Sequence, residues 1–131
     1  MSKKGAISER ELVHLFWDKG FAAVRVAGSG RMNYPSPDIL VGIGDKKLAI
    51  ECKSNKSGSV YLTQKEIEEL RVFSELFKAV PLIGIRSNNK SWFFLNICDL
   101  KKTEKNFSVS VNLIKDKGMD FEQLVSLNQK V

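Results

Sequence analysis

The chain has 131 residues, of which 43% are hydrophobic and 27% charged, and its formal net charge is +6 at pH 7. This favours one globular domain with a buried core, and the positive charge fits either a lysine-rich surface or a polyanion partner such as nucleic acid. No run approaches the about 20 apolar residues that span a bilayer, no secretory signal is visible, and two cysteines are too few for a disulfide framework, so we expect a cytoplasmic protein.

A first helix is predicted over residues 8–19, where Ser8 and Glu11 match a capping box, although a start near Lys4 is also compatible. Its apolar stripe is formed by Leu12, Val13, Phe16 and Trp17. Glu9 falls on the same stripe. A carboxylate there is costly unless it is paired, hydrogen-bonded or metal-bound; the alternative is that Glu9 only complements the helix dipole.

A strand is predicted over residues 21–27, in which Arg25 either faces water or points into a site at the end of the strand. The loop over residues 28–37 contains Gly28-Ser29-Gly30. Such a segment offers main-chain N–H groups and a hydroxyl that can approach a phosphate closely, although an ordinary flexible loop has the same composition.

Residues 37–53 are predicted to form a β-hairpin around a Gly44-Asp45 turn. If the loop holds an even number of residues, Asp38 lies opposite Glu51 or Lys53, and all three share one face of the sheet. An odd loop would place Asp38 on the other face. Two carboxylates and an ammonium at one end of a small sheet can bind a metal and activate water.

A second helix is predicted to run from Thr63 to about Lys78, because Thr63 and Glu66 form a capping box. The side chains expected to face inward are Ile67, Leu70, Phe73 and Phe77. Gln64 and Lys65 stand in the first turn, where exposed N–H groups favour an anion, although a solvated turn is the simpler alternative.

The other predicted strands cover residues 60–62, 80–86, 91–97 and 107–111, and a short C-terminal helix begins at Asp120. Four consecutive large apolar residues, from Trp92 to Leu95, indicate a strand that is covered on both faces or that packs on a second subunit. The order of elements predicts a mixed α/β sheet flanked by helices.

With these segments the chain resembles an archaeal Holliday-junction resolvase of the PD-(D/E)XK nuclease superfamily. The resemblance covers residues 3 to about 95 well and the C-terminal part loosely. It is carried by Lys4-Gly5-Ala6, Glu9-Arg10-Glu11-Leu12, Lys19-Gly20-Phe21-Ala22, Val24-Arg25, Gly28-Ser29-Gly30, Pro37-Asp38-Ile39 and Ile50-Glu51-Cys52-Lys53. Glu-x-Lys alone is a weak signal; the full set, in this structural context, is much more specific.

The resemblance implies a restriction-endonuclease-like mixed sheet of about five strands flanked by helices, in a single domain over residues 1–131 with a short basic arm at about residues 1–7. It also implies a C₂ homodimer that nicks four-way DNA junctions symmetrically with Mg²⁺, or Mn²⁺ in its place, in association with the nucleoid. The Trp92–Leu95 run and the apolar side of the second helix are the candidate dimer interfaces.

The site residues follow from the same resemblance. The catalytic positions would be Glu9, Ser29, Asp38, Glu51 and Lys53. The metal would be held by Asp38, Glu51 and the main-chain carbonyl of Cys52, with Glu9 holding the metal or its waters. The expected DNA contacts are Lys3, Lys4, Arg10, Arg25, Arg31, Lys56, Gln64 and Lys65.

Alternative functions stay open at this point. A related nuclease of the superfamily could act on flapped, nicked or foreign DNA with the same chemistry. A non-catalytic DNA-binding module would be expected to lack Asp38, Glu51 or Lys53, and all three are present. A basic α/β domain with a surface ion-pair cluster is the remaining alternative.

Overall fold

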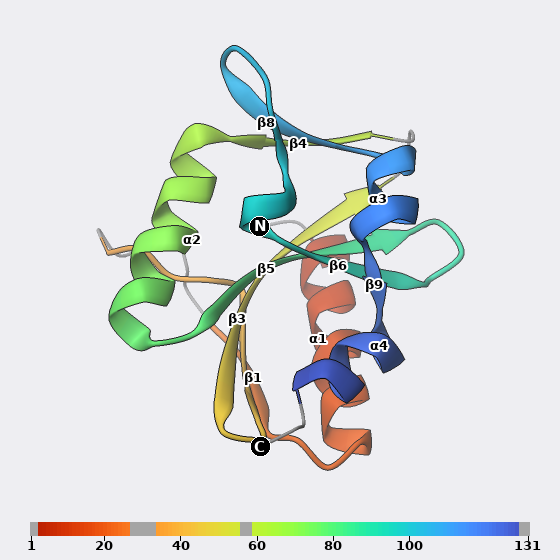
Figure 1. Cartoon of the computed structure of the whole chain (residues 1–131). Helices are drawn as coiled ribbons and strands as arrows, with labels where there is room; N and C mark the ends of the chain where they lie inside the picture. Colours follow the sequence, from red (N-terminus) through yellow and green to blue (C-terminus); the bar gives the residue numbers. More distant parts are fainter. Residues whose placement is uncertain (1–2, 27–33, 56–58, 129–131) are drawn as a thin grey trace.

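The computed structural model describes residues 3–26, 34–55 and 59–128 (Figure 1). Its helices are α1 (Lys3–Asp18), α2 (Gln64–Phe77), α3 (Val111–Lys117), α4 (Phe121–Asn128) and the short 3₁₀ turn η1 (Ile97–Asp99). Its strands are β1 (Ala23–Arg25), β2 (Ile39–Ile43), β3 (Lys46–Asn55), β4 (Ser59–Thr63), β5 (Val80–Ser87), β6 (Trp92–Asn96), β7 (Lys101–Lys102), β8 (Asn106–Ser110) and β9 (Met119–Asp120). None of the described helices is long and apolar enough to cross a membrane.

The main sheet has the strand order β1-β2-β3-β5-β6-β9, with β3 and β5 parallel and the other neighbours antiparallel. A second sheet of order β4-β8-β7 lies beside it. The predicted mixed sheet flanked by helices is therefore confirmed, and β9 adds a short sixth strand to the five expected. Helix α2 connects the two sheets, because it follows β4 directly and leads into β5.

The main sheet is covered on both faces, and each face has its own apolar layer. On one face, Leu12 and Phe16 of α1 pack with Leu124 of α4 against the sheet. On the other face, Ile67 and Leu70 of α2 pack against it together with residues of the second sheet. Figure 1 shows α1 and α4 on one side of the main sheet and α2 on the other. This division matters below, because the candidate site residues are distributed over both faces.

The hairpin of β2 and β3 has a two-residue loop, so the even-loop expectation is confirmed. Ile43 pairs with Lys46 across the turn and Ile39 pairs with Ile50. Gly44 has a left-handed φ of 60°, which glycine adopts without strain at the first central position of a type II′ turn. The main-chain N–H of Asp38, the residue just before β2, donates to the carbonyl of Ile50 at 3.0 Å, so Asp38 lies beside the part of β3 that carries Glu51.

Of the two predicted starts of the first helix, the one near Lys4 is confirmed and the capping box at Ser8 was wrong. Helix α1 begins at Lys3, so Ser8 lies buried within it and does not cap it, and residues 3–7 are helical. Trp17 was also misplaced on the buried stripe. Its side chain is 55% exposed, because the indole N–H donates to the carbonyl of Ala23 at 2.9 Å at the edge of the sheet.

The Trp92–Leu95 run is covered on both faces within the chain, which is the first of the two predicted alternatives. Trp92 and Phe94 are buried in the layer under α1, and Leu95 is buried in the layer under α2. Phe93 is partly buried. The run is continuously apolar because β6 has a packed layer on each side, as strands buried on both faces do.

Candidate active site

Glu51 and Lys53 of β3 lie on the face of the main sheet that carries α2, because they alternate with Ile50, which belongs to the apolar layer under α1. Asp38 lies just before β2, next to this part of β3. Asp38 is held in place by β3, because its Oδ2 accepts a hydrogen bond of 2.8 Å from the main-chain N–H of Cys52. The carboxylate thus continues the ladder between β2 and β3 at the point where the main-chain pairing ends.

The two carboxylates disfavour each other's negative charge. Burial raises the pKa of Glu51, and the nearby negative charge of Asp38 raises it further, to about 8. Burial also raises the pKa of Asp38, against the lowering effect of the hydrogen bond from Cys52. A pair of partly buried carboxyls in this state is stabilised by any cation that enters between them, since opposite charge favours the ionised form.

The donor chemistry of this pair fits a hard divalent cation. Among the described residues no three Asp, Glu, His or Cys side chains are grouped as a metal cluster. A cation between Asp38 and Glu51 would therefore complete its coordination with main-chain oxygen and water, which is how Mg²⁺ is commonly bound in proteins. The main-chain carbonyl of Cys52 is the nearest candidate in sequence, since it lies between Glu51 and Lys53.

Lys53 is held by a residue of α2 that the sequence did not connect with it. Its Nζ lies 2.5 Å from Oε2 of Glu66. Glu66 is the third residue of α2, and its Oε1 accepts a 2.9 Å hydrogen bond from the main-chain N–H of Thr63 as part of the predicted capping box, which is confirmed. The hydrogen bond from Lys53 is the largest cause that lowers the pKa of Glu66, although burial opposes it. One carboxylate therefore joins the start of α2 to the lysine of the site.

Glu9 lies on the opposite face of the sheet, beneath α1. Its side chain is nearly fully buried and accepts a 2.9 Å hydrogen bond from Nε of Arg25, whose side chain is partly buried. The expectation that a carboxylate on this stripe needs a partner is confirmed. Burial raises the pKa of Glu9 and the charge of Asp38 raises it further, while Arg25 lowers it. The Glu9 carboxylate is therefore close enough to Asp38 for the charge of Asp38 to affect its pKa.

The thiol of Cys52 packs against the apolar layer under α1, as expected for a residue that alternates with Glu51 and Lys53. Burial raises its pKa well above the ordinary value. A thiol in such surroundings stays protonated, so it is neither a nucleophile nor a metal ligand. Only the main-chain atoms of Cys52 face the candidate site.

The remaining predicted residues are spread around the site. Arg10 is exposed on α1, and Gln64 and Lys65 are exposed in the first turn of α2, where Lys65 forms a loose 3.8 Å ion pair with Glu69. Lys3 and Lys4 lie in α1, but their side chains are outside the described part of the structure, as are Ser29, Arg31 and Lys56 altogether.

A charged pair that the sequence did not indicate joins α1 to β5: Nη2 of Arg86 lies 2.9 Å from both carboxylate oxygens of Glu11.

Comparison with known proteins gives one consistent family. The family model described as archaeal Holliday junction resolvase (Hjc) matches residues 1–131. The chain is 42% identical to the crossover junction endodeoxyribonuclease Hjc of Archaeoglobus fulgidus, over 83% of this chain and 80% of that protein. It is 31% identical to the enzyme of the same name from Methanocaldococcus jannaschii, over 98% of this chain and 92% of that protein. The solved structure of Archaeoglobus fulgidus Hjc, described as a Holliday junction resolvase, superimposes with a TM-score of 0.86 at 35% identity, covering 95% of this chain and 97% of that one.

Proposed function

The chain belongs to the archaeal Holliday junction resolvase family and is a crossover junction endodeoxyribonuclease, and we propose that Asp38, Glu51 and Lys53 form its cleavage site. The observation that supports this assignment most is the placement of two partly buried carboxyls, with pKa values raised, beside a lysine at one end of the β2–β3 hairpin. Carboxyls whose pKa values are raised by burial and by a neighbouring charge are concentrated at functional sites.

Asp38, Glu51 and the carbonyl of Cys52 would hold one divalent cation, with Glu9 contributing through water from beneath α1. Such a bound Mg²⁺, or Mn²⁺ in its place, would stabilise the charge that develops on the phosphate and acidify a water molecule. Three hard oxygen donors with room for water suit this ion. The buried pair of Glu9 with Arg25 supports a fixed position for the Glu9 carboxylate.

Lys53 would orient the attacking water and stabilise the negative charge of the transition state. An ammonium group has three donors, so Lys53 can keep its hydrogen bond to Glu66 while it donates to water and to a phosphate oxygen. Because Glu66 is part of the α2 capping box, Lys53 is oriented before the DNA binds. Such preorganisation lowers the reorganisation needed in the transition state.

The junction would be held through its phosphates. We assign Ser29 and Arg25 to the scissile phosphate or its neighbour, and the basic or polar side chains of Lys3, Lys4, Arg10, Arg31, Lys56, Gln64 and Lys65 to the flanking backbone. Support comes from the formal charge of +6 and from the exposure of Arg10, Gln64 and Lys65. Contacts of this kind follow the shape of a branched duplex rather than its sequence. Because the substrate is junction DNA, we propose that the enzyme works at the nucleoid.

Two symmetric nicks require two active sites related by a two-fold axis, which a C₂ homodimer supplies. The C-terminal end of α2 supports this assembly: Leu76 is 80% exposed and Phe77 is 41% exposed. An apolar hollow of about 250 Å³ adjoins Phe77, with the exposed Val24 of β1 on its wall. The apolar side of α2 therefore remains the candidate dimer interface.

Replacing Asp38 or Glu51 by alanine tests the cleavage site. We expect Asp38→Ala to reduce junction cleavage in Mg²⁺ by at least about 1000-fold, because a lost metal ligand removes most of the charge stabilisation. Junction binding in EDTA, followed by gel shift, should stay within about threefold of the wild type. Cleavage at an undiminished rate by either variant would contradict the assignment.

A further inference from the structure

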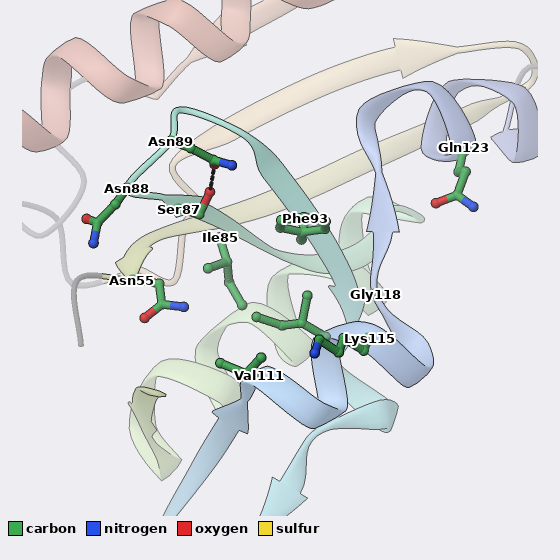
Figure 2. A pocket seen from close by; sticks show the side chains of 11 residues that line it. Asn55, Ile85, Ser87, Asn88, Asn89, Phe93, Val111, Lys115, Gly118 and Gln123 are labelled. Carbon is green, nitrogen blue, oxygen red and sulfur yellow. Dashed lines mark hydrogen bonds between the residues drawn. The ribbon is translucent and has the colours of Figure 1, made fainter. Parts of the chain in front are cut away.

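A deep pocket lies on the same face of the main sheet as the cleavage site, and no part of the mechanism above uses it. Its volume is about 650 Å³, and it lies between the ends of β3 and β5, strand β6 and helix α3 (Figure 2). Asn55 of β3, Ile85 of β5 and Phe93 of β6 line it, with Val111 and Lys115 of α3 opposite them.

The pocket adjoins the cleavage site through one row of the sheet. Lys53 pairs with Ile85, and Ile85 pairs with Phe93, so these three residues lie side by side across β3, β5 and β6. Two interstrand spacings separate Lys53 from Phe93, or about 10 Å. Asn55, two residues beyond Lys53 on the same face of β3, also lines the pocket.

The lining combines an apolar floor with a rim that donates hydrogen bonds. Phe93 and Val111 supply aromatic and aliphatic surface above the buried Ile85, while Asn89, Lys115 and Gln123 supply polar groups. No Asp or Glu is among the described residues that line the pocket. A ligand that is flat, partly apolar and rich in acceptor atoms matches this combination better than a cation or an aliphatic chain.

Two of the rim amides have their oxygen atoms occupied by their own chain. Oδ1 of Asn89 accepts from the main-chain N–H of Ser91 at 3.2 Å and from the hydroxyl of Ser87, a contact drawn in Figure 2. Oε1 of Gln123 accepts from the main-chain N–H of Asp120 at 2.9 Å. The amide NH₂ groups are thus the parts that can contact a ligand, and they add two donors to the ammonium of Lys115.

We propose that this pocket receives a nucleobase of the strand being cut, from a nucleotide close to the scissile phosphate and unstacked at the branch point. The proposal rests on the cleavage site assigned above, since the position of Lys53 sets which nucleotides can reach Phe93. Phe93 and Val111 provide the surface against which the base packs, and the donors of Asn89 and Lys115 face its ring nitrogens and carbonyl oxygens. Unstacking costs least where base pairing is already interrupted, so the pocket favours a branch over a continuous duplex.

The test combines single abasic sites in a synthetic four-way junction with substitutions in the pocket, and measures binding in EDTA. For the wild type we expect one or two positions near the nick where removal of the base weakens binding about tenfold, as loss of one base stacked on an aromatic ring does. Phe93→Leu should weaken binding of the intact junction by a similar factor and make it insensitive to the same abasic positions.

Since Phe93 is partly buried and its loss can disturb the fold, Val111→Trp provides a second variant. Val111 is 44% exposed at the start of α3, so a tryptophan there fills the pocket without emptying the core. Asn112→Trp, on the next and exposed residue outside the lining, is the matched control. We expect Val111→Trp, but not the control, to abolish the dependence on the abasic positions.

The proposal is overturned if no abasic position weakens binding by the wild type, or if Val111→Trp and Asn112→Trp respond alike. Neither result bears on the cleavage site, because binding in EDTA does not depend on Asp38 or Glu51 as catalysts. Failure of the cleavage assignment would instead appear as Mg²⁺-dependent cutting by Asp38→Ala. The two ideas are therefore tested separately.

Discussion

At the scale of single residues, the site is defined by carboxyls that the fold keeps partly or fully buried, where their charged form is disfavoured. Glu9 is compensated by Arg25 at 2.9 Å, whereas Glu51 faces Asp38 with no comparable cation and has its pKa raised to about 8. Lys53 lowers the pKa of both Asp38 and Glu51 but is drawn toward Glu66. The imbalance is local to Asp38, just before β2, and Glu51 of β3, which is where a divalent cation is expected.

This imbalance predicts how the metal-free protein responds to pH. A folded-state pKa of about 8 against 4.5 in the unfolded chain means that the folded state binds more protons between these values. Its contribution to the free energy of unfolding is therefore complete below pH 4.5 and is lost as the pH rises toward 8. We expect Glu51 to cost on the order of 2 kcal/mol at pH 8 relative to pH 5, since Asp38 shares the charge.

Urea unfolding in EDTA at both pH values measures this effect. Glu51→Gln, which cannot ionise, should lose most of the difference between pH 5 and pH 8. Millimolar Mg²⁺ should raise the melting temperature of the wild type more at pH 8 than at pH 5, and that of the variant much less. Equal pH dependence in wild type and variant would show that Glu51 does not carry the charge imbalance.

At the scale of elements, the hairpin and the start of α2 together build the site. The two-residue turn at Gly44 sets the register of β2 on β3, which brings Asp38 to the main-chain N–H of Cys52 beside Glu51. Helix α2 then places Glu66 within hydrogen-bonding distance of Lys53, so the first turn of the helix orients a side chain of β3. A change in the capping box should therefore alter the orientation of Lys53 and also reduce the stability of α2.

Glu66→Gln tests this connection, because glutamine can still accept the hydrogen bond from Thr63 but no longer carries the charge that holds Lys53. We expect the rate of junction cleavage to fall about tenfold with junction affinity unchanged, and no further fall when the substitution is made in Lys53→Ala. Glu68→Gln is the matched control, since Glu68 on the same helix pairs with Arg71. Additive losses of rate in the double variant would mean that Glu66 does not act through Lys53.

The elements that could be predicted from the sequence are those with local signals. The Gly44-Asp45 turn predicts the hairpin, and Thr63 with Glu66 predicts the start of α2. The same kind of signal misled at Ser8, because a helix that begins earlier carries the pair through its interior. The contact between Glu66 and Lys53 depends on how α2 packs across the sheet, which no local pattern contains.

At the scale of the whole molecule, the two faces of the main sheet differ in what they carry. The face under α1 and α4 is a packed layer with Glu9 at its edge near Asp38, whereas the face toward α2 carries Glu51, Lys53 and the pocket lined by Phe93. The exposed apolar surface at the end of α2 belongs to neither, and we propose it as the dimer interface. The family resemblance predicted a dimer, but its interface depends on which apolar residues the fold leaves outside.

Leu76→Glu tests the interface, because a charge in the middle of an apolar contact is costly when the contact forms and harmless when it does not. We expect the variant to sediment as a monomer at micromolar concentration, where the wild type sediments as a dimer. A cooperative thermal unfolding transition should show that this monomer is still folded. Leu127→Glu on α4, at a position that is 56% exposed, should leave the dimer intact. A dimer that survives Leu76→Glu would place the interface elsewhere.

The cleavage of a synthetic four-way junction, with both nicks mapped on all four strands, tests the central claim most directly. We expect the wild type to cut two opposed strands at symmetric positions with Mg²⁺ and not with EDTA. Flapped and linear duplexes of the same sequence should be cut far more slowly. A mixture of wild type and Asp38→Ala should yield junctions nicked on one strand only. Cutting without a divalent cation, or paired nicks from Asp38→Ala alone, would contradict it.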